Sequence, residues 1–223
     1  MDYSRQQRLL MGSRDSIMII GVGGLGSWVA ITLALTGQVS KIYICDDDTV
    51  EESNLNRTLF RQKDIGKKKV KALRDIIAEL RPEQIVFPLD IKFQINDELP
   101  SPVTTVIDCS DNLNLYKNYN FDTVDYFKGG YDGYGYTLYL GQSDDVWDIP
   151  EQAGYNMVSS YVVPPQIMAG IITELLINAD THHYVTRELL HSNRSYIINI
   201  ESTNELIYNY YLNKKNEKQK SDN

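Results

Sequence analysis

The sequence predicts an α/β domain built on a mostly parallel sheet, and three observations support this prediction. Short apolar runs that suit buried strands alternate along the chain with longer stretches of helical periodicity. A glycine-rich turn stands between the first such strand and the first such helix. Apolar residues make up 42% of the 223 residues, which is enough to build a core on both sides of a sheet. We therefore expect helices on both faces.

The first predicted strand, helix and second strand form a βαβ unit. An apolar run at 17–20 predicts a buried strand, and the sequence GVGGLG follows at 21–26. An apolar-rich stretch at 27–36 predicts a helix, with Gly37 where a helix would end. A second strand is predicted at 41–45. The glycines thus lie between a strand and a helix, the context in which G-x-G-x-x-G indicates a Rossmann-like nucleotide-binding fold.

Each glycine of this turn has a physical reason to be there. Gly21 allows a tight turn, Gly23 lets a phosphate approach the backbone, and Gly26 lets the helix pack closely on the strand. Gly24 lies in the same cradle, at the positive end of the helix dipole. Asp46 ends the second strand about twenty residues later, where an acid can accept hydrogen bonds from ribose hydroxyls. The alternative is a glycine-rich turn in a fold that binds nothing.

A basic segment follows the acid. Residues 54–57 are polar and loop-like, and a helix is predicted from about residue 64 until Pro82 stops it. Its apolar positions recur at helical spacing: Val70, Leu73, Ile76, Ile77 and Leu80. Lysines in a first turn oppose the helix dipole, so a cluster of them favours a polyanionic partner such as the triphosphate of ATP: Lys67, Lys68, Lys69 and Lys71. The alternative is a solvated basic patch.

The rest of the chain continues the alternation of strands and helices. The predicted elements are strands at 84–87 and 103–108, a loop with a helical turn at 91–102, a helix at 112–119, strands at 124–127 and 136–140, an apolar helix at 166–178, and a C-terminal antiparallel hairpin at 194–200 and 205–212. We expect one domain over residues 1–212, followed by a disordered tail at 213–223.

Composition argues against several classes of function. The formal net charge of −8 disfavours nucleic-acid binding as the main role. The chain has no apolar run of about eighteen residues and no signal-peptide start, which predicts a soluble, cytoplasmic protein that does not enter membranes. Cys45 and Cys109 fall in or beside predicted core strands, so we expect no disulfide. Three histidines without an acid or thiol pattern are interpreted as surface residues rather than metal ligands.

Six short motifs occur in order between the start of the chain and about residue 140. They are Arg5-Gln6, the glycine turn at 21–26, DDDTV at 46–50, SNLNR at 53–57, DIGKKK at 64–69 and DCSDN at 108–112. Together these motifs resemble the ThiF/MoeB/HesA family, the bacterial relatives of ubiquitin-activating enzymes. The resemblance implies adenylation of a carboxylate by ATP, with release of pyrophosphate. The carboxylate would be the free C-terminus of a small ubiquitin-like protein or peptide.

The resemblance also implies a role for each site residue. The nucleotide would be held by the glycine cradle, by acids at the second strand and by cations and an amide beyond it: Gly21, Gly23, Gly24, Gly26, Asp46, Asp48, Asn54, Arg57 and Lys69. Asp111 would bind Mg²⁺, although it could instead cap the helix that follows it. Arg5 would reach into the ATP site of a neighbouring protomer, which implies a homodimer; Arg8 is a competing candidate.

The sequence also departs from the family. Residues 142–160 correspond to the family's crossover loop but lack the cysteine that many relatives carry there, and the chain has no Cys-x-x-Cys pair for a structural zinc. We interpret Cys109 as a core cysteine rather than as a substitute nucleophile. Residues 127–136 either guide a substrate's tail along a sheet edge or form a hairpin with exposed aromatics. The helix at 166–178 is apolar almost all round, so we expect it to be buried, across the dimer interface.

Two other functions stay open. The missing crossover cysteine favours a non-catalytic ThiF-like scaffold or partner subunit, whereas the complete set of ATP-site residues opposes it. The glycine turn and Asp46 also permit an NAD-dependent oxidoreductase. That function leaves Arg57, Lys69 and Asp111 unexplained.

Overall fold

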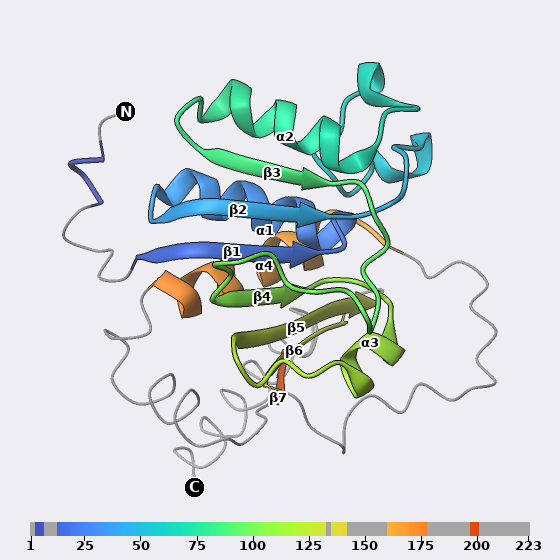
Figure 1. Ribbon diagram of the computed structural model, residues 1–223. Helices are drawn as coiled ribbons and strands as arrows, with labels where there is room; N and C mark the ends of the chain where they lie inside the picture. Colours follow the sequence, from blue (N-terminus) through green and yellow to red (C-terminus); the bar gives the residue numbers. More distant parts are fainter. Residues whose placement is uncertain (1–2, 7–12, 133–134, 142–159, 178–196, 201–223) are drawn as a thin grey trace, which may run out of the picture.

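The computed structural model describes residues 3–6, 13–132, 135–141, 160–177 and 197–200. Its core is a seven-stranded sheet with the order β3-β2-β1-β4-β5-β6-β7 (Figure 1). The strands are β1 (Arg14–Ile20), β2 (Val39–Cys45), β3 (Ile85–Leu89), β4 (Thr105–Asp108), β5 (Asp125–Asp132), β6 (Gly135–Leu140) and β7 (Ile197–Ile200). The helices are α1 (Gly24–Thr36), α2 (Lys69–Leu80), α3 (Leu113–Asn118) and α4 (Val163–Ile177), with short 3₁₀ helices η1 (Glu52–Asn54) and η2 (Gln62–Asp64).

The sheet is mostly parallel, as predicted. The strands β3, β2, β1, β4 and β5 are parallel to one another. Strand β6 runs antiparallel to β5, and β7 runs antiparallel to β6. Of the predicted C-terminal hairpin, the described residues include only part of the first strand, β7, which pairs with β6. The second strand of the hairpin and the tail lie outside the described residues, so the hairpin itself stays a prediction. Because β6 and β7 extend the sheet beyond β5, residues 127–132 belong to a β5–β6 hairpin and not to a sheet edge.

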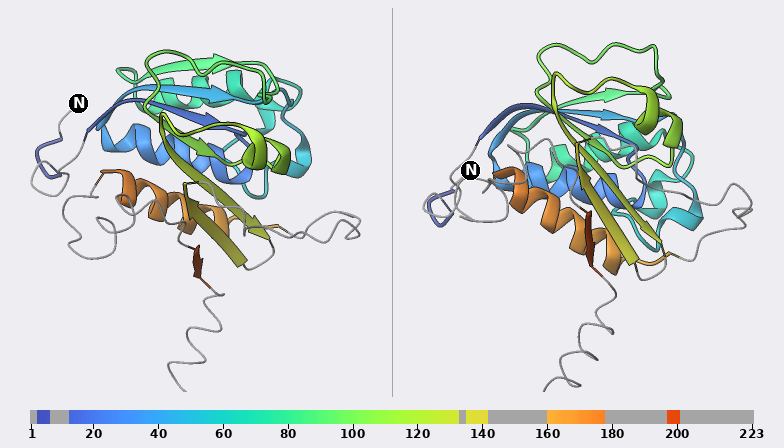
Figure 2. Two further views of the ribbon diagram at one scale, coloured as in Figure 1. Left: turned by 60° about the horizontal axis from the view of Figure 1, so that its bottom comes forward. Right: turned by 90° about the horizontal axis from the view of Figure 1, so that it is seen from below.

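Helices cover both faces of the sheet, and the connections explain which helix lies where (Figure 2). Parallel crossovers are right-handed, so the connections β1–α1–β2 and β2–α2–β3, which move in one direction, place both helices on one face. The connection β4–α3–β5 moves in the other direction and places α3 on the opposite face. The helix α4 returns to the first face, where it packs along α1.

The connection between β3 and β4 is a loop with a single hydrogen-bonded turn at 94–97, as predicted, and no helix is assigned within it. Asp97 holds this turn. Its carboxylate accepts a hydrogen bond from the backbone N–H of Gln94, and its own N–H donates to the Gln94 carbonyl. Such local side-chain bonds favour a turn over a helix.

Helix burial follows the predicted spacing with one correction. In α2 the predicted apolar positions are buried except Leu80, which ends the helix at the surface and is 46% exposed. In α4, Gln166, Gly170 and Glu174 are exposed on the single chain while the opposite side packs on α1, so burial across a dimer interface stays a prediction. None of the described helices is long and apolar enough to cross a membrane.

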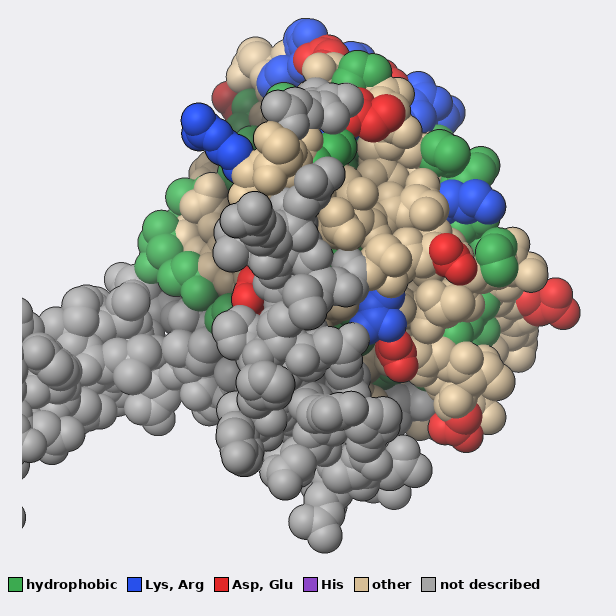
Figure 3. All heavy atoms as spheres, turned by 90° about the vertical axis from the view of Figure 1, so that its left-hand side faces the viewer, with side chains coloured by type: hydrophobic (Ala, Val, Ile, Leu, Met, Phe, Trp, Pro, Cys, Tyr) green, Lys and Arg blue, Asp and Glu red, His purple; other side chains and the backbone are tan. Residues whose placement is uncertain are grey.

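The end of the molecule that holds the N-terminal ends of the parallel strands carries mixed charge (Figure 3). Among the described residues visible on this face, acidic and basic side chains are interspersed. Neither sign gathers into a single patch there. The functional residues predicted from the motifs lie mainly at the other end, where the strands finish.

A buried ion pair fixes the ends of β4 and β5. Asp108 and Lys128 are register partners on these parallel strands, and the Lys128 ammonium lies 3.1 Å from the Asp108 carboxylate. Both residues are fully buried. The carboxylate also accepts hydrogen bonds from the Tyr126 hydroxyl, at 2.8 Å, and from the backbone N–H and hydroxyl of Ser110. Lys128 in turn donates to the Ser110 carbonyl, so the turn after β4 is held from both sides.

A second buried acid fixes the turn before α2. Asp64 is fully buried and accepts hydrogen bonds from Arg61 and from the Lys67 ammonium, at 2.8 and 2.9 Å. Burial alone would raise the pKa of Asp64, but the hydrogen bonds from Arg61 and Lys67 outweigh it and lower the pKa to about 2. The Asp64 carboxylate is therefore ionised under all ordinary conditions and ties this turn together.

Replacing Lys128 with methionine should destabilise the protein strongly, because it leaves the Asp108 carboxylate buried without its cationic partner. We expect the free energy of unfolding, measured by urea titration, to fall by about 3–5 kcal/mol. The double variant D108N/K128M is the matched control, since it removes both charges and should recover much of the loss. A K128M protein as stable as the wild type would contradict this assignment.

Stability should depend on pH through Asp64. Its pKa is lowered in the folded protein, so its contribution is complete above the unfolded value of 3.8 and is lost as the pH falls toward about 2. We expect D64N to lose about 2 kcal/mol of unfolding free energy at pH 7 relative to the wild type. Urea titrations of both proteins from pH 6 down to about pH 2 should show this difference shrinking. A difference that stays constant over this range would contradict the role of the ionised carboxylate.

Candidate functional site

The candidate site lies where the strand order reverses, at the carboxyl ends of β1 and β4. From β1 the chain proceeds to β2 and β3 on one side, whereas β4 leads to β5 on the other side (Figure 1). Ligands of open α/β sheets bind at such a switch point, because the loops that follow the two strands diverge there. The glycine turn follows β1, the three aspartates follow β2, and Asp111 follows β4. The fold therefore places these three motifs at one end of the sheet, whereas the Arg5-Gln6 motif lies at the other end.

Gly21 and Gly26 serve close backbone packing, as predicted. Gly21 has a φ of +79°, and a Cβ placed on it would lie 2.9 Å from the backbone nitrogen of Ser110. A Cβ on Gly26 would lie 1.9 Å from the Gly21 carbonyl oxygen. Any side chain at either position would push the start of α1 away from β1 and β4. These two glycines shape the turn and need not touch a ligand.

Gly23 and Gly24 differ from each other. A Cβ placed on Gly23 would meet no described atom within 4 Å, and no side chain caps α1 at this residue. No described residue therefore covers the start of α1 beside Gly23, where helix amides and the dipole favour an anion. A Cβ on Gly24 would instead lie 1.8 Å from the hydroxyl oxygen of Tyr131. The structure thus gives Gly24 a contact within the protein, which the motif alone did not indicate.

Asp46 stands at the predicted place and also supports the glycine turn. Its carboxylate accepts hydrogen bonds from the backbone N–H of Val22, at 2.8 Å, and of Asp48, at 2.9 Å. Each carboxylate oxygen has two lone pairs, so both oxygens could also accept from ribose hydroxyls. The carboxylates of Asp46, Asp47 and Asp48 offer oxygens within 4.8 Å of one another. They place negative charge at the end of β2, beside the glycine turn that Asp46 contacts.

The lysines before and within α2 pair with acids. The Lys69 ammonium lies 2.6 Å from the carboxylate of Asp48, and the Lys69 side chain is only 11% exposed. Lys68 donates to the Asp47 carbonyl and lies 3.0 Å from Asp90. Lys69 is therefore no solvated surface lysine, because its ammonium meets a carboxylate of the three aspartates, whereas Lys67 and Lys71 stay about half exposed.

Asn54 and Arg57 lie on a loop that is anchored to α1. The Trp28 indole N–H, on α1, donates to the Arg57 carbonyl at 2.9 Å. Asn54 is buried, and its side-chain oxygen accepts from the backbone N–H of Glu51 at the start of η1. The Arg57 guanidinium is half-buried and donates to the Asn56 side-chain oxygen at 3.0 Å. The loop is thus rigidly placed, while Arg57 remains partly accessible.

Asp111 is exposed at the carboxyl end of β4. The cap of α3 is Asn112, whose side chain accepts a hydrogen bond from the Leu115 N–H at 3.1 Å. The alternative in which Asp111 caps this helix is therefore wrong. An exposed carboxylate at this position suits a Mg²⁺ ion that keeps several waters and bridges to phosphate oxygens.

Cys109 does not look like a nucleophile. Burial raises the pKa of its thiol, and the neighbouring Asp108 raises it further. Burial likewise raises the pKa of Cys45 to about 12. A reactive cysteine needs a lowered pKa, so both thiols fit the predicted core role.

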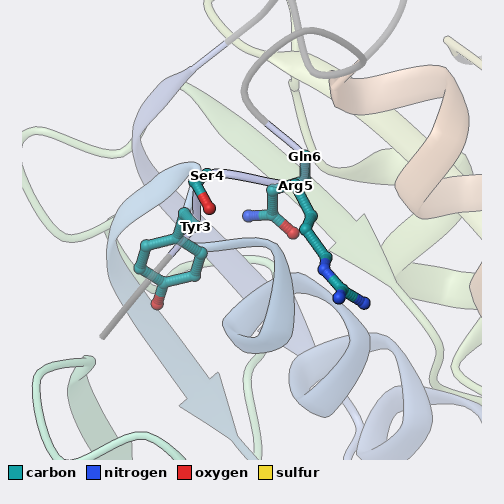
Figure 4. A pocket seen from close by; sticks show the side chains of 4 residues that line it. All are labelled: Tyr3, Ser4, Arg5 and Gln6. Carbon is teal, nitrogen blue, oxygen red and sulfur yellow. The ribbon is translucent and has the colours of Figure 1, made fainter.

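Arg5 lies far from the glycine turn of its own chain. Together with Tyr3, Ser4 and Gln6 it lines a shallow hollow (Figure 4). Gln6 donates to the carbonyl of Thr36, the last residue of α1, whereas the glycine turn is at the other end of this 13-residue helix, about 20 Å away. Within one chain the structure does not bring Arg5 to the site. Arg8, residues 142–159 and the histidines lie outside the described residues.

The sequence motifs predicted no role for three residues that the structure places near the site. Asp108 and Lys128 form the buried pair described above, and Tyr131 covers Gly24. A lysine within an apolar strand is a signal that could have been noticed, because a buried lysine needs a carboxylate partner. Tyr131 left no comparable signal among the many tyrosines of the chain.

Comparison with known proteins found relatives named adenylyltransferases. A molybdopterin-synthase adenylyltransferase from Salmonella typhimurium is 32% identical over 124 residues, which cover 53% of this chain and 47% of that protein. The adenylyltransferase and sulfurtransferase uba4 of Aspergillus clavatus is 38% identical over 99 residues, 43% of this chain and 20% of that protein. This chain therefore spans about half, or less, of the length of these relatives.

The fold also matches solved structures. A crystal structure of MccB from E. coli superimposes with a TM-score of 0.65 at 19% identity, over 84% of this chain and 62% of that one. PaaA superimposes with a TM-score of 0.61 at 22% identity, over 84% of this chain and 64% of that one. At these identities the likeness concerns the fold alone. The model of the ThiF family matches residues 2–120, more than half of the sequence, and the chain belongs to the ThiF family.

Proposed function

We propose that this protein is an ATP-dependent adenylyltransferase that activates a carboxylate as an acyl-adenylate and releases pyrophosphate. The observation that carries the proposal is the open start of α1 beside Gly23, at the switch point of the sheet. Lys69 and Arg57 belong to segments that follow β2, and Asp111 follows β4, which supports the proposal. The relatives named adenylyltransferases support the proposal.

In this reaction the protein positions the carboxylate against ATP and neutralises the charge of the phosphates, and it forms no covalent intermediate itself. The carboxylate attacks the α-phosphorus in line, and the bond to pyrophosphate breaks. Amides at the start of α1 would hold the phosphates, and Asp46 would hold the ribose. Arg57 and Lys69 would neutralise charge on the phosphates, assisted by Asn54. Asp111 would hold Mg²⁺, which would screen the phosphate oxygens when bound.

The substrate would be the C-terminus of a small ubiquitin-like protein or peptide. A relative named ubiquitin-like modifier-activating enzyme 5, from Dictyostelium discoideum, favours this class of substrate; it is 38% identical over 68 residues, 30% of this chain and 18% of that protein. We also propose a homodimer in which Arg5 completes the site of the partner, since Arg5 lies about one helix length from its own glycine turn. The partly exposed apolar side of α4, with Ile167, Ile171 and Leu175, would suit such an interface.

A non-catalytic scaffold is the second candidate. One observation favours it: the Lys69 ammonium is already paired with Asp48 at 2.6 Å, so a nucleotide would have to compete for it. A scaffold would bind a ubiquitin-like protein without needing ATP. Nucleotide binding therefore separates the two functions, and it also tests the oxidoreductase alternative.

We expect calorimetry to detect ATP binding that depends on Mg²⁺, and no binding of NAD. The variant D111A should lose the Mg²⁺-dependent part of the affinity, because it lacks the metal-binding carboxylate. The control D122A removes an exposed acid from the loop before β5 and should bind like the wild type. Binding of NAD but not ATP would contradict the adenylation proposal. Binding of neither nucleotide would favour the scaffold.

The variant R57A should bind ATP·Mg²⁺ at least about tenfold more weakly than the wild type. A hydrogen bond to a charged phosphate typically contributes about 1.5–3 kcal/mol. The matched control is R74A, because Arg74 is an exposed arginine on α2 that pairs with its neighbour Asp75. Equal affinities of R57A and R74A in the same titration would remove Arg57 from the nucleotide site.

A further inference from the structure

Tyr131 occupies an unusual position at the start of α1. It lies on β5, yet its hydroxyl fills the space that a side chain at Gly24 would need. The nearest atoms to a Cβ on Gly24 are all from the Tyr131 phenol, at 1.8 to 3.2 Å. The tyrosine thus sits directly on the first turn of the helix, one residue beyond the open position at Gly23. Its side chain is half-buried and packs against the core beneath α1.

One hydrogen bond holds the hydroxyl of this tyrosine, and a second anchors the residue that makes it. The Ser160 hydroxyl donates to the Tyr131 hydroxyl oxygen at 3.1 Å. The Ser160 carbonyl accepts from the side-chain amide of Asn56 at 3.0 Å. Asn56 belongs to the same loop as Arg57 and also accepts from its guanidinium. Three distant segments, the loop at 53–57, β5 and the residue at 160, therefore meet at the start of α1.

We propose that Tyr131 is a nucleotide-binding residue whose hydroxyl donates a hydrogen bond to a phosphate oxygen of ATP at the first turn of α1. This inference rests on the proposed function. A phenol hydroxyl can accept and donate at the same time, so Tyr131 can accept from Ser160 and still donate to a ligand. The helix start beside it favours an anion. Gly24 is glycine because a side chain there would displace the tyrosine.

The alternative is that Tyr131 only packs, and the two roles separate cleanly. Packing needs the ring, whereas donation to a phosphate needs the hydroxyl. The variant Y131F keeps the ring and removes the hydroxyl. A packing role therefore predicts no change in ligand affinity, and a donor role predicts a selective loss for ligands that carry the contacted phosphate.

The test is calorimetry of wild type and Y131F with three probes: ATP·Mg²⁺, pyrophosphate and AMP. We expect Y131F to bind ATP·Mg²⁺ about tenfold more weakly, with an unchanged thermal midpoint. The same loss with AMP or with pyrophosphate would identify the phosphate that Tyr131 contacts. The control Y43F removes a hydroxyl from a tyrosine stacked on Phe87 over the other face of the sheet, and it should leave all affinities unchanged. Equal ATP affinity of Y131F and the wild type would overturn the inference.

A second comparison tests the role of Gly24. If this glycine serves only to seat the tyrosine, G24A should weaken ATP binding, but G24A/Y131A should bind no more weakly than Y131A alone. A double variant much weaker than Y131A would contradict this explanation, because Gly24 would then face the ligand itself. A wild-type protein that binds no ATP would instead refute the proposed function. Failure of the inference and failure of the function are therefore distinguishable.

Discussion

The backbone contact between Gly21 and Ser110 is the constraint on which the site depends. Strands β1 and β4 are hydrogen-bonded neighbours, so the turns that follow them must pass each other without a side chain between them. The positive φ of Gly21 turns the chain away from β4 and into α1. Gly26 then brings the helix back against the Gly21 carbonyl. The open helix start beside Gly23 follows from this packing.

Carboxylates hold each of the loops that surround this contact. Asp46 binds the glycine turn, Asp108 binds the turn after β4, and Asp64 binds the turn before α2. Asp48 holds Lys69. Asp48, Asp64 and Asp108 each pair with a lysine or an arginine, whereas Asp46 binds backbone N–H groups. A triphosphate that enters this site would compete with Asp48 for Lys69.

The structural features that depend on the spacing of residues close together in the chain could be predicted from the sequence. The glycine turn, the parallel sheet and the buried stripe of α2 follow from short-range patterns, and the structure confirms them. Contacts between distant segments could not be predicted in the same way. To predict the pairing of Lys128 with Asp108, one must know the register of β4 against β5. To predict the contact between Tyr131 and Gly24, one must know that β5 lies beside α1. The roles given to Arg5, Arg57, Lys69 and Asp111 stay predictions.

The most direct test of the account is a crystal structure of the protein with a non-hydrolysable ATP analogue and Mg²⁺. The account predicts that the phosphates lie over Gly23 at the start of α1, with the ribose at Asp46 and the metal ion at Asp111. A nucleotide bound elsewhere on the sheet, or phosphates that lie away from the start of α1, would contradict the central claim that ATP binds at the carboxyl ends of β1 and β4.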